Sequence, residues 1–485
     1  MLTVFSFKNL CATFPQAPLQ LIAIFLAVLL TGLIGIWSRP HELLAFFWPA
    51  NALILALLLR FPKFNPLYIL LAAILALAVA NIATNNSPAL TTALISADLT
   101  AIFSILLLLR CFGLHYKQYN QGLTFFYLLI LIAIGSAVGA LTAVYALPLS
   151  SQQFIDNNYL WYEFVLWWTG EMQNYVLFLP IFLAFPGLKQ WQHLYKKLQA
   201  KVELPKRDDF IPFMLTLISI AGIIFLEHPN SLYLPMAALT WAALRYHLFT
   251  IALINLLLCL AFFYSLNIFH NKPNTELYLA NVVSMRVGFL MLFISSLTVC
   301  LVSTNQRFLF KKLRFLVEHD SLTRAMSRHH FMKSAQYALN HAQHAQSSIA
   351  ILMIDLDFFK KINDIYGHQV GDLALQHFVQ VTQQHLRSSD LFGRLGGEEF
   401  AIILQRVSIE QAQTIAQRVQ HALVEQPLQL DYGEDLVLQL SIGLVYLPKQ
   451  QHTYRLDDLL HHADLALYQA KQNGRNQVYT STTLF

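Results

Sequence analysis

The chain contains Arg394-Leu395-Gly396-Gly397-Glu398-Glu399-Phe400, and this stretch decides the fold of its last third. Apolar residues flank it at 391–392 and 400–404, and two apolar runs joined by Gly-Gly predict a β-hairpin with a tight turn. Gly396 and Gly397 can both adopt positive φ and leave the backbone open to a ligand. The carboxylates of Glu398 and Glu399 suit a hydrated magnesium ion that carries phosphates. The alternative is a solvated hairpin tip, because so short a string is a weak signal.

The composition divides the chain into two modules. Of its 485 residues, 56% are hydrophobic and only 12% are charged, which is typical of a membrane protein. The apolar runs fill residues 15–303, which we interpret as an integral membrane domain, and the polar residues 320–485 form a soluble module. The net charge of +5 does not predict a nucleic-acid partner, because the cations cluster beside membrane segments.

The membrane half contains about ten predicted transmembrane helices, each near the ~20 residues that cross a bilayer. We place them at 19–37, 43–60, 67–83, 89–109, 123–147, 159–185, 210–226, 231–247, 248–268 and 280–303. Alternate loops carry nearly all the Lys and Arg, so the positive-inside rule predicts that both termini are cytoplasmic. An even number of spans agrees with that orientation.

Polar residues inside these spans either pair with one another or together line a polar cavity. They are Asn51, Asp98, Glu163, Glu171, Asn174, Arg245 and Arg286. Around them, Trp48-Pro49-Ala50-Asn51, the stretch 167–171 and the stretch 239–245 resemble the membrane-associated sensor (MASE-type) domain of bacterial signalling proteins. The resemblance covers roughly residues 15–305 and carries over no ligand residues. It implies an inner-membrane location.

A connecting segment at 304–319 continues the last span. Apolar residues recur there at helical spacing, from Phe308 to Val317, with basic residues between them. Two interpretations are open: a basic helix on anionic lipid, or a short two-helix stalk that holds two soluble modules together.

The soluble module alternates predicted helices and strands, which is typical of an α+β sandwich of antiparallel sheet and helices. We expect helices at 328–346, 370–387, 408–425 and 456–472, a strand at 348–355, and either a strand pair or one long strand at 436–447, besides the hairpin. Ser408 and Gln411 form a capping box. Gly371 is expected to open its helix and so to provide an anion-binding N-terminus.

Several side chains around these elements suit a nucleotide. Asp355 and Asp357 end the first strand beside the hairpin, where a metal site in two halves is expected. Asn363 and Asp372 offer the donor and acceptor pattern of a guanine reader. Three cations suit phosphates: Lys360, and Lys471 with Arg475 at i, i+4.

These motifs together resemble the GGDEF-domain diguanylate cyclases. The resemblance runs from about 318 to 480 and is carried by Asp320-Ser321-Leu322-Thr323, by 355–372, by 396–400 and by 470–476. It implies a palm-like fold related to nucleotide polymerases and cyclases. It also implies condensation of two GTP molecules to cyclic di-GMP with release of two pyrophosphates, in a homodimer.

The resemblance implies a role for each matching residue. Magnesium, two ions per active site with manganese as a possible substitute, is bound by Asp355, Glu398, Glu399 and the Leu356 carbonyl. Glu398 is the expected proton acceptor and catalytic residue. The expected substrate-binding residues are Asn363, His368, Asp372, Lys360, Lys471 and Arg475. An inhibitory site for cyclic di-GMP is expected at Arg387 and Asp390, with Arg418 as a partner.

One departure from the family concerns residues 324–329, which read Arg-Ala-Met-Ser-Arg-His where the family has a Gly and an Asn. The change affects the turn after the connecting segment. The metal carboxylates and the guanine readers are intact.

The sequence therefore predicts a membrane-bound diguanylate cyclase regulated by a signal that the membrane domain senses. Two other functions stay open. One is a catalytically silent receptor for cyclic di-GMP or GTP, and the other is a transporter with a regulatory cytoplasmic module.

Overall fold

The structure is a computed structural model. It describes the chain except for residues 1–16, 40–44, 63, 115–123, 151–159, 186–206, 227–230, 232, 270–274, 431–432, 434, 450–453 and 482–485. The chain forms two compact units, Met1–Arg307 and Phe308–Phe485, and we describe each by itself.

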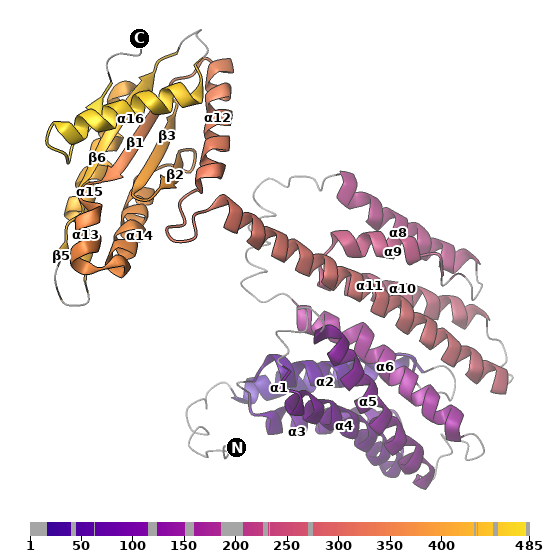
Figure 1. The fold of residues 1–485 in the computed structure, drawn as a ribbon. Helices are drawn as coiled ribbons and strands as arrows, with labels where there is room; N and C mark the ends of the chain where they lie inside the picture. The colour runs from indigo at the N-terminus through magenta and orange to yellow at the C-terminus, as the bar shows by residue number, and fades with distance from the viewer. Residues whose placement is uncertain are drawn as a thin grey trace. The chain divides into compact units, whose positions relative to one another are not determined.

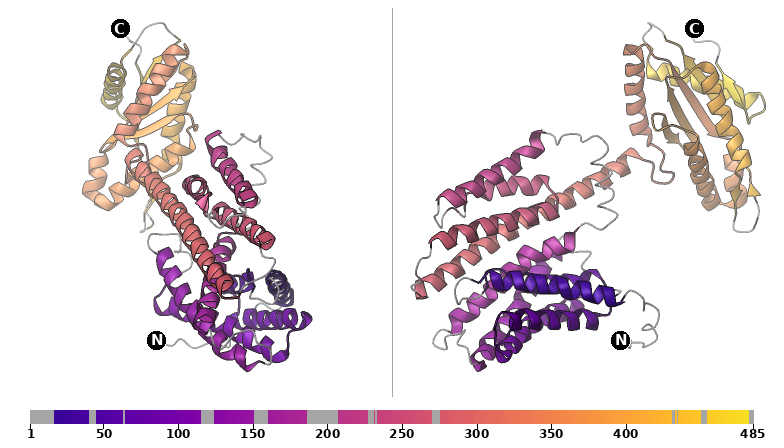
Figure 2. Two further views of the ribbon diagram at one scale, coloured as in Figure 1. Left: turned by 90° about the vertical axis from the view of Figure 1, so that its right-hand side faces the viewer. Right: turned by 180° about the vertical axis from the view of Figure 1, so that it is seen from behind.

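The first unit is a set of apolar α-helices (Figure 1). The described helices are α1 (Ala17–Trp37), α2 (Pro49–Arg60), α3 (Pro66–Ala83), α4 (Pro88–Cys111), α5 (Thr124–Ala146), α6 (Leu160–Ala184), α8 (Arg207–Leu226), α9 (Met236–Arg245), α10 (Leu248–Phe269) and α11 (Thr275–Glu318). α4 packs against α5, and α2 packs against α6. Figure 2 shows the helices of this unit from two further sides.

The described helices lie where the sequence predicts spans, but not all of them are long enough to cross a bilayer. Six are both long and apolar enough to do so. α2 has 12 residues and α9 has 10, well short of the ~20 that a span needs. The number of spans therefore stays a prediction. So does the orientation, because most of the loop cations behind it, including Lys63, Lys117 and the lysines of 186–206, lie outside the described residues.

α11 is one continuous helix of 44 residues, about 66 Å long at 1.5 Å per residue. It contains both the last predicted span and nearly all of the connecting segment. The helical character predicted for that segment is therefore confirmed.

The second unit is built on a five-stranded sheet in the order β2-β3-β1-β6-β7. These strands are β1 (Ile349–Leu356), β2 (Leu391–Gly396), β3 (Glu399–Gln405), β6 (Leu440–Leu447) and β7 (Val478–Thr480). β1 lies at the centre, is buried along its whole length, and pairs antiparallel with β3 and β6. The predicted antiparallel sheet holds except for β7, which pairs parallel with β6.

Helices cover both faces of this sheet (Figure 1). α12 (Arg328–His344) and α16 (Leu456–Gln472) share one hydrophobic core with the side chains of Ile351 and Ile403. α14 (His368–Gln384) and α15 (Ile409–Glu425) share another with Leu352 and Ile402. Successive side chains of β1 and β3 alternate between the two cores, as the two-residue period of a strand requires.

The structure also refines the local predictions. Within the stretch 436–447, Leu440–Leu447 form one strand, β6, whereas Leu436 ends β5 (Asp435–Leu436), which pairs with β4 (Leu428–Gln429) in a small hairpin. A short helix, α13 (Phe359–Tyr366), was missed. Gly371 does not open α14, because the helix begins at His368 behind Gly367 at φ 85°. The capping box of Ser408 and Gln411 is confirmed.

Candidate active site

The end of β1 lies beside the β2–β3 hairpin. Asp355 is the direct antiparallel partner of Glu399, and the backbone N–H of Leu356 donates to the carbonyl of Glu398 over 3.4 Å. Of the two glycines that can adopt positive φ, Gly397 does so, with a φ of +47°, whereas Gly396 stays outside the left-handed region. No atom lies within 4 Å of the Cβ position of either glycine, so the tip of the hairpin exposes bare backbone.

Carboxylates crowd this corner of the sheet. Asp355 is 6% exposed, and the Lys471 ammonium lies 2.8 Å from its Oδ1. Burial raises the pKa of Asp355 above its ordinary range, and the charges of Glu398 and Asp357 act in the same direction, while Lys471 opposes them. Glu398 is half-buried and Glu399 is exposed. These negative charges are partly removed from water and repel one another, and a bound cation would reduce that repulsion.

The position of Lys471 depends on how closely α16 lies on the sheet. A Cβ at Gly443 of β6 would overlap the backbone of α16 at Ala463 and Leu467. Because this glycine has no side chain, the helix lies directly on the strand and its last turn brings Lys471 to Asp355.

Asp357 holds the loop that carries Arg475, a role that the sequence did not reveal. Asp357 is 4% exposed, and its carboxylate accepts hydrogen bonds from Ser441 Oγ at 2.8 and 3.0 Å and from the backbone N–H of Asn476 at 2.9 Å. Gly474, Arg475 and Asn476 have successive φ values of 111°, 66° and 43°. A backbone in three consecutive left-handed conformations needs such an anchor.

Arg475 is therefore not placed by helical spacing, and the i, i+4 argument for pairing it with Lys471 is wrong, since α16 ends at Gln472. Its guanidinium lies 5.0 Å from the ring centroid of Phe358 and 4.0 Å from Asp357. The ammonium of Lys361, which the sequence did not single out, lies 4.8 Å from the same ring. Lys360 is exposed on α13. The end of β1 is thus bordered by cations that suit phosphate groups.

The predicted base readers come from two neighbouring helices. The Asn363 side chain of α13 lies where a Cβ of Gly371 would be, so this buried glycine of α14 makes room for the amide. Asp372 follows Gly371 and is exposed, as is His368 at the start of the same helix.

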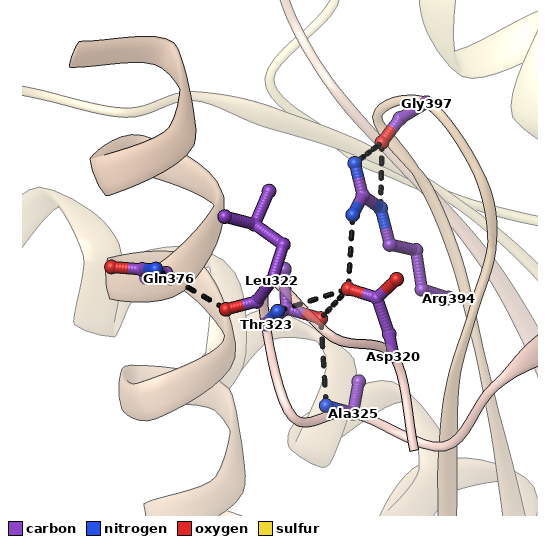
Figure 3. Close-up of polar contacts among 7 residues, drawn as sticks. All are labelled: Asp320, Leu322, Thr323, Ala325, Gln376, Arg394 and Gly397. Carbon is purple, nitrogen blue, oxygen red and sulfur yellow. Dashed lines mark hydrogen bonds and ion pairs between the residues drawn. The ribbon is translucent and has the colours of Figure 1, made fainter. Parts of the chain in front are cut away.

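A polar network ties the segment after α11 to the hairpin (Figure 3). Oδ1 of Asp320 accepts from Arg394 Nη1 at 2.9 Å, from the Thr323 backbone N–H at 2.9 Å and from Thr323 Oγ1 at 2.7 Å. The same guanidinium donates through Nε and Nη2 to the carbonyl of Gly397, at 2.9 and 2.7 Å. Arg394 was part of the quoted stretch, but its spacing from Asp320 gave no signal of this contact.

The altered turn at 324–329 forms within this network. Arg324 occupies the left-handed region at φ 65°, where a glycine would be unstrained. Its guanidinium lies 5.5 Å from the ring centroid of Phe315. Ser327 caps α12 by accepting from the His330 N–H and donates to the carbonyl of Val317. The missing Gly and Asn therefore do not prevent the turn.

The Asp320 network predicts an effect of pH. Burial by itself would raise the pKa of Asp320, but the bonds from Thr323 and Arg394 outweigh it and lower the pKa below its ordinary value. The resulting stability is present above the unfolded pKa of about 3.9 and is lost as the pH falls through the folded pKa. We expect Asp320→Asn to lower the free energy of unfolding of residues 308–485 by about 1 kcal/mol at pH 7. Urea titrations followed by circular dichroism between pH 3 and 7 measure it.

The difference between wild type and this variant should shrink as the pH falls below about 4, because wild type then loses the ion pair too. Asp464→Asn, at an exposed position of α16, is the control. A constant difference at every pH would contradict the role of the Asp320 charge.

The predicted inhibitory residues form a compact turn next to the C-terminus of α14. The backbone N–H of Arg387 donates to the Asp390 carboxylate at 2.9 Å. Arg418 of α15 donates to the carbonyl of His385 at 2.7 Å, close in sequence to Arg387. Both arginines are exposed.

No group of three or more His, Cys, Asp or Glu side chains in the described part of the chain could hold a metal by itself. Asp355 and Glu398 still fit a hard divalent cation, because such an ion is commonly bound by one or two carboxylates together with water and substrate phosphates. The raised pKa of Asp355 is consistent with this.

Comparisons with known proteins match both units. A family model described as "Diguanylate cyclase, GGDEF domain" matches residues 317–477, and the MASE1 model matches residues 18–307. A probable diguanylate cyclase, DgcF of Escherichia coli O157:H7, is 25% identical over 480 residues, which are 95% of this chain and 94% of that protein. Diguanylate cyclase A of Treponema denticola is 34% identical over 168 residues, which are 33% of this chain and 44% of that protein.

Two solved structures of GGDEF-type domains each match about a third of this chain. The GGDEF domain of DgcB from Caulobacter crescentus in complex with c-di-GMP is 27% identical, with a TM-score of 0.33, over 34% of this chain and 96% of that one. The active GGEEF domain of a diguanylate cyclase from Vibrio cholerae is 29% identical, with a TM-score of 0.30, over 32% of this chain and 97% of that one.

Proposed function

Because this chain belongs to the MASE1 family and carries a C-terminal GGDEF domain of the diguanylate cyclase family, we propose that it condenses two GTP molecules into cyclic di-GMP and two pyrophosphates. The observation that supports this best is the arrangement at the end of β1. Buried Asp355 lies there beside the Glu398–Glu399 hairpin, with Lys471 in contact and the Arg475 loop anchored next to it.

The metal would be held by the carboxylates of Asp355 and Glu398 and by the Leu356 carbonyl, with Glu399 serving a second ion. Magnesium suits these oxygen ligands, and manganese is a chemically similar substitute. When bound, the metal neutralises the negative charge of the triphosphate.

The chain's own side chains bind and orient the substrate. Cations at Lys360, Lys471 and Arg475 hold the phosphates. The Asn363 amide and the Asp372 carboxylate read the guanine edge, and His368 assists them. Glu398 Oε accepts the proton of the attacking 3′-hydroxyl, a role for which its half-buried position at the hairpin leaves it accessible.

One site binds one GTP, whereas the product joins two, so the active form is a homodimer in which two GGDEF modules face each other. The connecting end of α11, residues 304–318, holds the two copies together and transmits the signal of the membrane unit. Product inhibition operates through Arg387, Asp390 and Arg418. The exposed guanidiniums of the two arginines suit the phosphates and guanine edges of cyclic di-GMP.

The loop charges support an inner-membrane protein with both termini in the cytoplasm, where GTP is available. The membrane unit then senses a signal and shifts the dimer between arrangements of its two GGDEF modules.

The purified full-length chain in lipid nanodiscs, given GTP and magnesium, tests the proposal. We expect cyclic di-GMP and pyrophosphate to appear in a ratio of one to two, measured by liquid chromatography and a coupled pyrophosphate assay. GTP binding without either product would contradict the proposal and favour a silent receptor. A chain without residues 1–300 should keep basal synthesis of cyclic di-GMP. If this shortened chain makes no cyclic di-GMP and the full chain transports a solute across the membrane, the result would favour a transporter.

A further inference from the structure

Phe358 is an exposed aromatic residue at the turn between β1 and α13. Its side chain is 45% exposed, so the ring gains little from burial. Its backbone lies in the left-handed region, with a φ of 57° and a ψ of 24°. That region is strained for a bulky residue, whereas Asn or Gly adopts it readily. The chain therefore has a strained residue at a position where Asn or Gly would make the same turn without strain.

The start of α13 gives a second reason to expect another residue at this position. Phe358 is the N-cap of α13, and its side chain makes no capping hydrogen bond. Its carbonyl accepts from the Ile362 N–H, as an N-cap carbonyl does. Asn, Asp or Ser at an N-cap would also accept from a nearby N–H and so stabilise the helix. Neither the turn nor the cap explains the phenylalanine, and residues that break local rules are typical of functional sites.

Two cations lie over the Phe358 ring. The Arg475 guanidinium is 5.0 Å from the ring centroid, and the Lys361 ammonium is 4.8 Å from it. Both distances are within the ~6 Å range of a cation–π interaction. Arg475 follows α16, in the loop that Asp357 anchors through the Asn476 N–H. The ring therefore connects this loop to the start of α13.

The Arg475 guanidinium keeps its hydrogen-bond donors available. Among the described residues, no acceptor takes a hydrogen bond from its N–H groups, and its ion pair with Asp357 is 4.0 Å long. The Asp357 carboxylate already accepts from Ser441 Oγ and from the Asn476 N–H. An aromatic face attracts a guanidinium without using an N–H donor. The ring can thus hold Arg475 while its N–H groups stay available for phosphate oxygens.

We propose that Phe358 is a positioning residue for the substrate triphosphate, because its ring holds the Arg475 guanidinium in the orientation that binds the phosphates. This inference rests on the proposed function, which gives Arg475 its phosphate-binding role. A free arginine side chain loses rotamer freedom when it binds an anion, and a guanidinium that the ring already holds loses less. Phe358 therefore strengthens the binding of GTP and has no part in the chemical step.

Binding measures this role without turnover. The probe is the α,β-methylene analogue of GTP, which cannot release pyrophosphate. It is titrated with magnesium into the full-length chain in nanodiscs, by isothermal titration. We expect Phe358→Leu to weaken binding about three- to tenfold, the effect of one lost cation–π contact together with the lost ordering of Arg475. Phe358→Tyr keeps the aromatic face and should bind within about twofold of the unmodified chain. Unchanged affinity in Phe358→Leu, or an equal loss in Phe358→Tyr, would overturn the proposal.

A double-mutant cycle shows whether Phe358 acts through Arg475. Arg475→Met alone should weaken binding of the analogue at least about tenfold, roughly the effect of one lost charged hydrogen bond. Adding Phe358→Leu should then change the affinity by less than about twofold, because no guanidinium is left for the ring to hold. Two losses that multiply would contradict the proposal. So would a loss from Phe358→Leu that disappears in a Lys361→Met background, since the ring would then act through Lys361.

Phe358→Asn separates positioning from a structural role. Asn removes the left-handed strain and supplies a capping side chain, so we expect amide hydrogen exchange of α13 in the full-length chain to slow at least about threefold. The same variant should weaken binding of the analogue as much as Phe358→Leu does. A structural role alone would move stability and binding in the same direction. Unchanged binding, or faster exchange together with weaker binding, would therefore overturn the proposal.

Kinetics of the full chain distinguishes a failure of this inference from a failure of the proposed function. Phe358→Leu should raise the KM for GTP by the same factor as it weakens binding of the analogue, and leave kcat within about twofold. If the unmodified chain binds the analogue but makes no cyclic di-GMP, the proposed function fails alone, and the binding results still decide the role of Phe358. If the unmodified chain does not bind the analogue, both fail.

Discussion

Replacing Glu398 with glutamine is expected to lower the rate of cyclic di-GMP synthesis by roughly 100- to 1000-fold, the usual loss when one electrostatic element of an active site is removed. Glutamine keeps the size of the side chain but removes the charge. The charge of Glu398 acts on the pKa of Asp355, which supports the proposal that the two carboxylates bind the same cation. A neutral amide at the hairpin tip binds a divalent ion weakly and cannot accept the 3′-hydroxyl proton.

The same substitution should not destabilise the fold. Glu398 raises the pKa of Asp355 by like-charge repulsion, so its removal favours the ionised form of Asp355 in the folded state. The free energy of unfolding at pH 7 should therefore be unchanged or slightly higher, which separates a catalytic defect from misfolding.

Initial rates with saturating GTP over a series of magnesium concentrations measure the effect. Glu425→Gln, an exposed position at the end of α15, is the matched control and should keep the wild-type rate. If Glu398→Gln keeps more than about a tenth of the wild-type rate at every magnesium concentration, the metal and proton roles belong elsewhere, with Glu399 as the next candidate.

How far the sequence predicted the site depends on whether each contact is local. The hairpin and the strand that ends at Asp355 were predictable, because apolar runs, glycines and capping residues act over a few positions. Ser408 and Gln411 could be paired by spacing alone, and the structure confirms the cap.

Contacts between distant segments gave no such signal. Asp320 accepts a hydrogen bond from Arg394, which is 74 residues away in the sequence, and Asp357 accepts one from Asn476, which is 119 residues away. Arg475 was paired with Lys471 because the two residues are four apart, but α16 ends at Gln472 and Arg475 lies in the left-handed segment that follows it. Periodicity describes regular elements, whereas such loops are fixed by tertiary hydrogen bonds.

The membrane half shows the same limit. Apolar length located its helices, yet 12 residues in α2 and 10 in α9 are too few for the spans predicted there. The sequence indicated that Asn51, Asp98 and Glu171 belong to a group of polar residues that pair with one another or line a cavity, but not which of them are in contact. Only the packing of α2, α4 and α6 brings their side chains into one cluster.

Gly443→Ala is expected to have the largest effect on stability, lowering the free energy of unfolding of residues 308–485 by about 3 kcal/mol, the upper end of the usual cost of overpacking. The added methyl group would overlap backbone atoms of α16 at Ala463 and Leu467, and backbone cannot rotate away as a flexible side chain does. α16 must move off β6, and the packing of Leu467 in the core is then weakened.

This displacement should also reach the active site. Lys471, in the last turn of α16, lies 2.8 Å from Asp355, so a shift of the helix separates the pair and moves the cation that we propose to bind the phosphates of GTP. We expect the variant to show a higher KM for GTP under conditions where it remains folded, because ground-state contacts to the phosphates are weakened. Urea titration of residues 308–485 and steady-state kinetics of the full chain measure the two effects.

Gly396→Ala is the matched control for stability. The same methyl group is added to the same sheet, but no atom lies within 4 Å of it and the φ of Gly396 is outside the left-handed region. Its free energy of unfolding should stay within about 0.5 kcal/mol of wild type. Equal stability of the two variants would mean that α16 can be lifted from the sheet at little cost, and the close contact at Gly443 would then not be what positions Lys471 against Asp355.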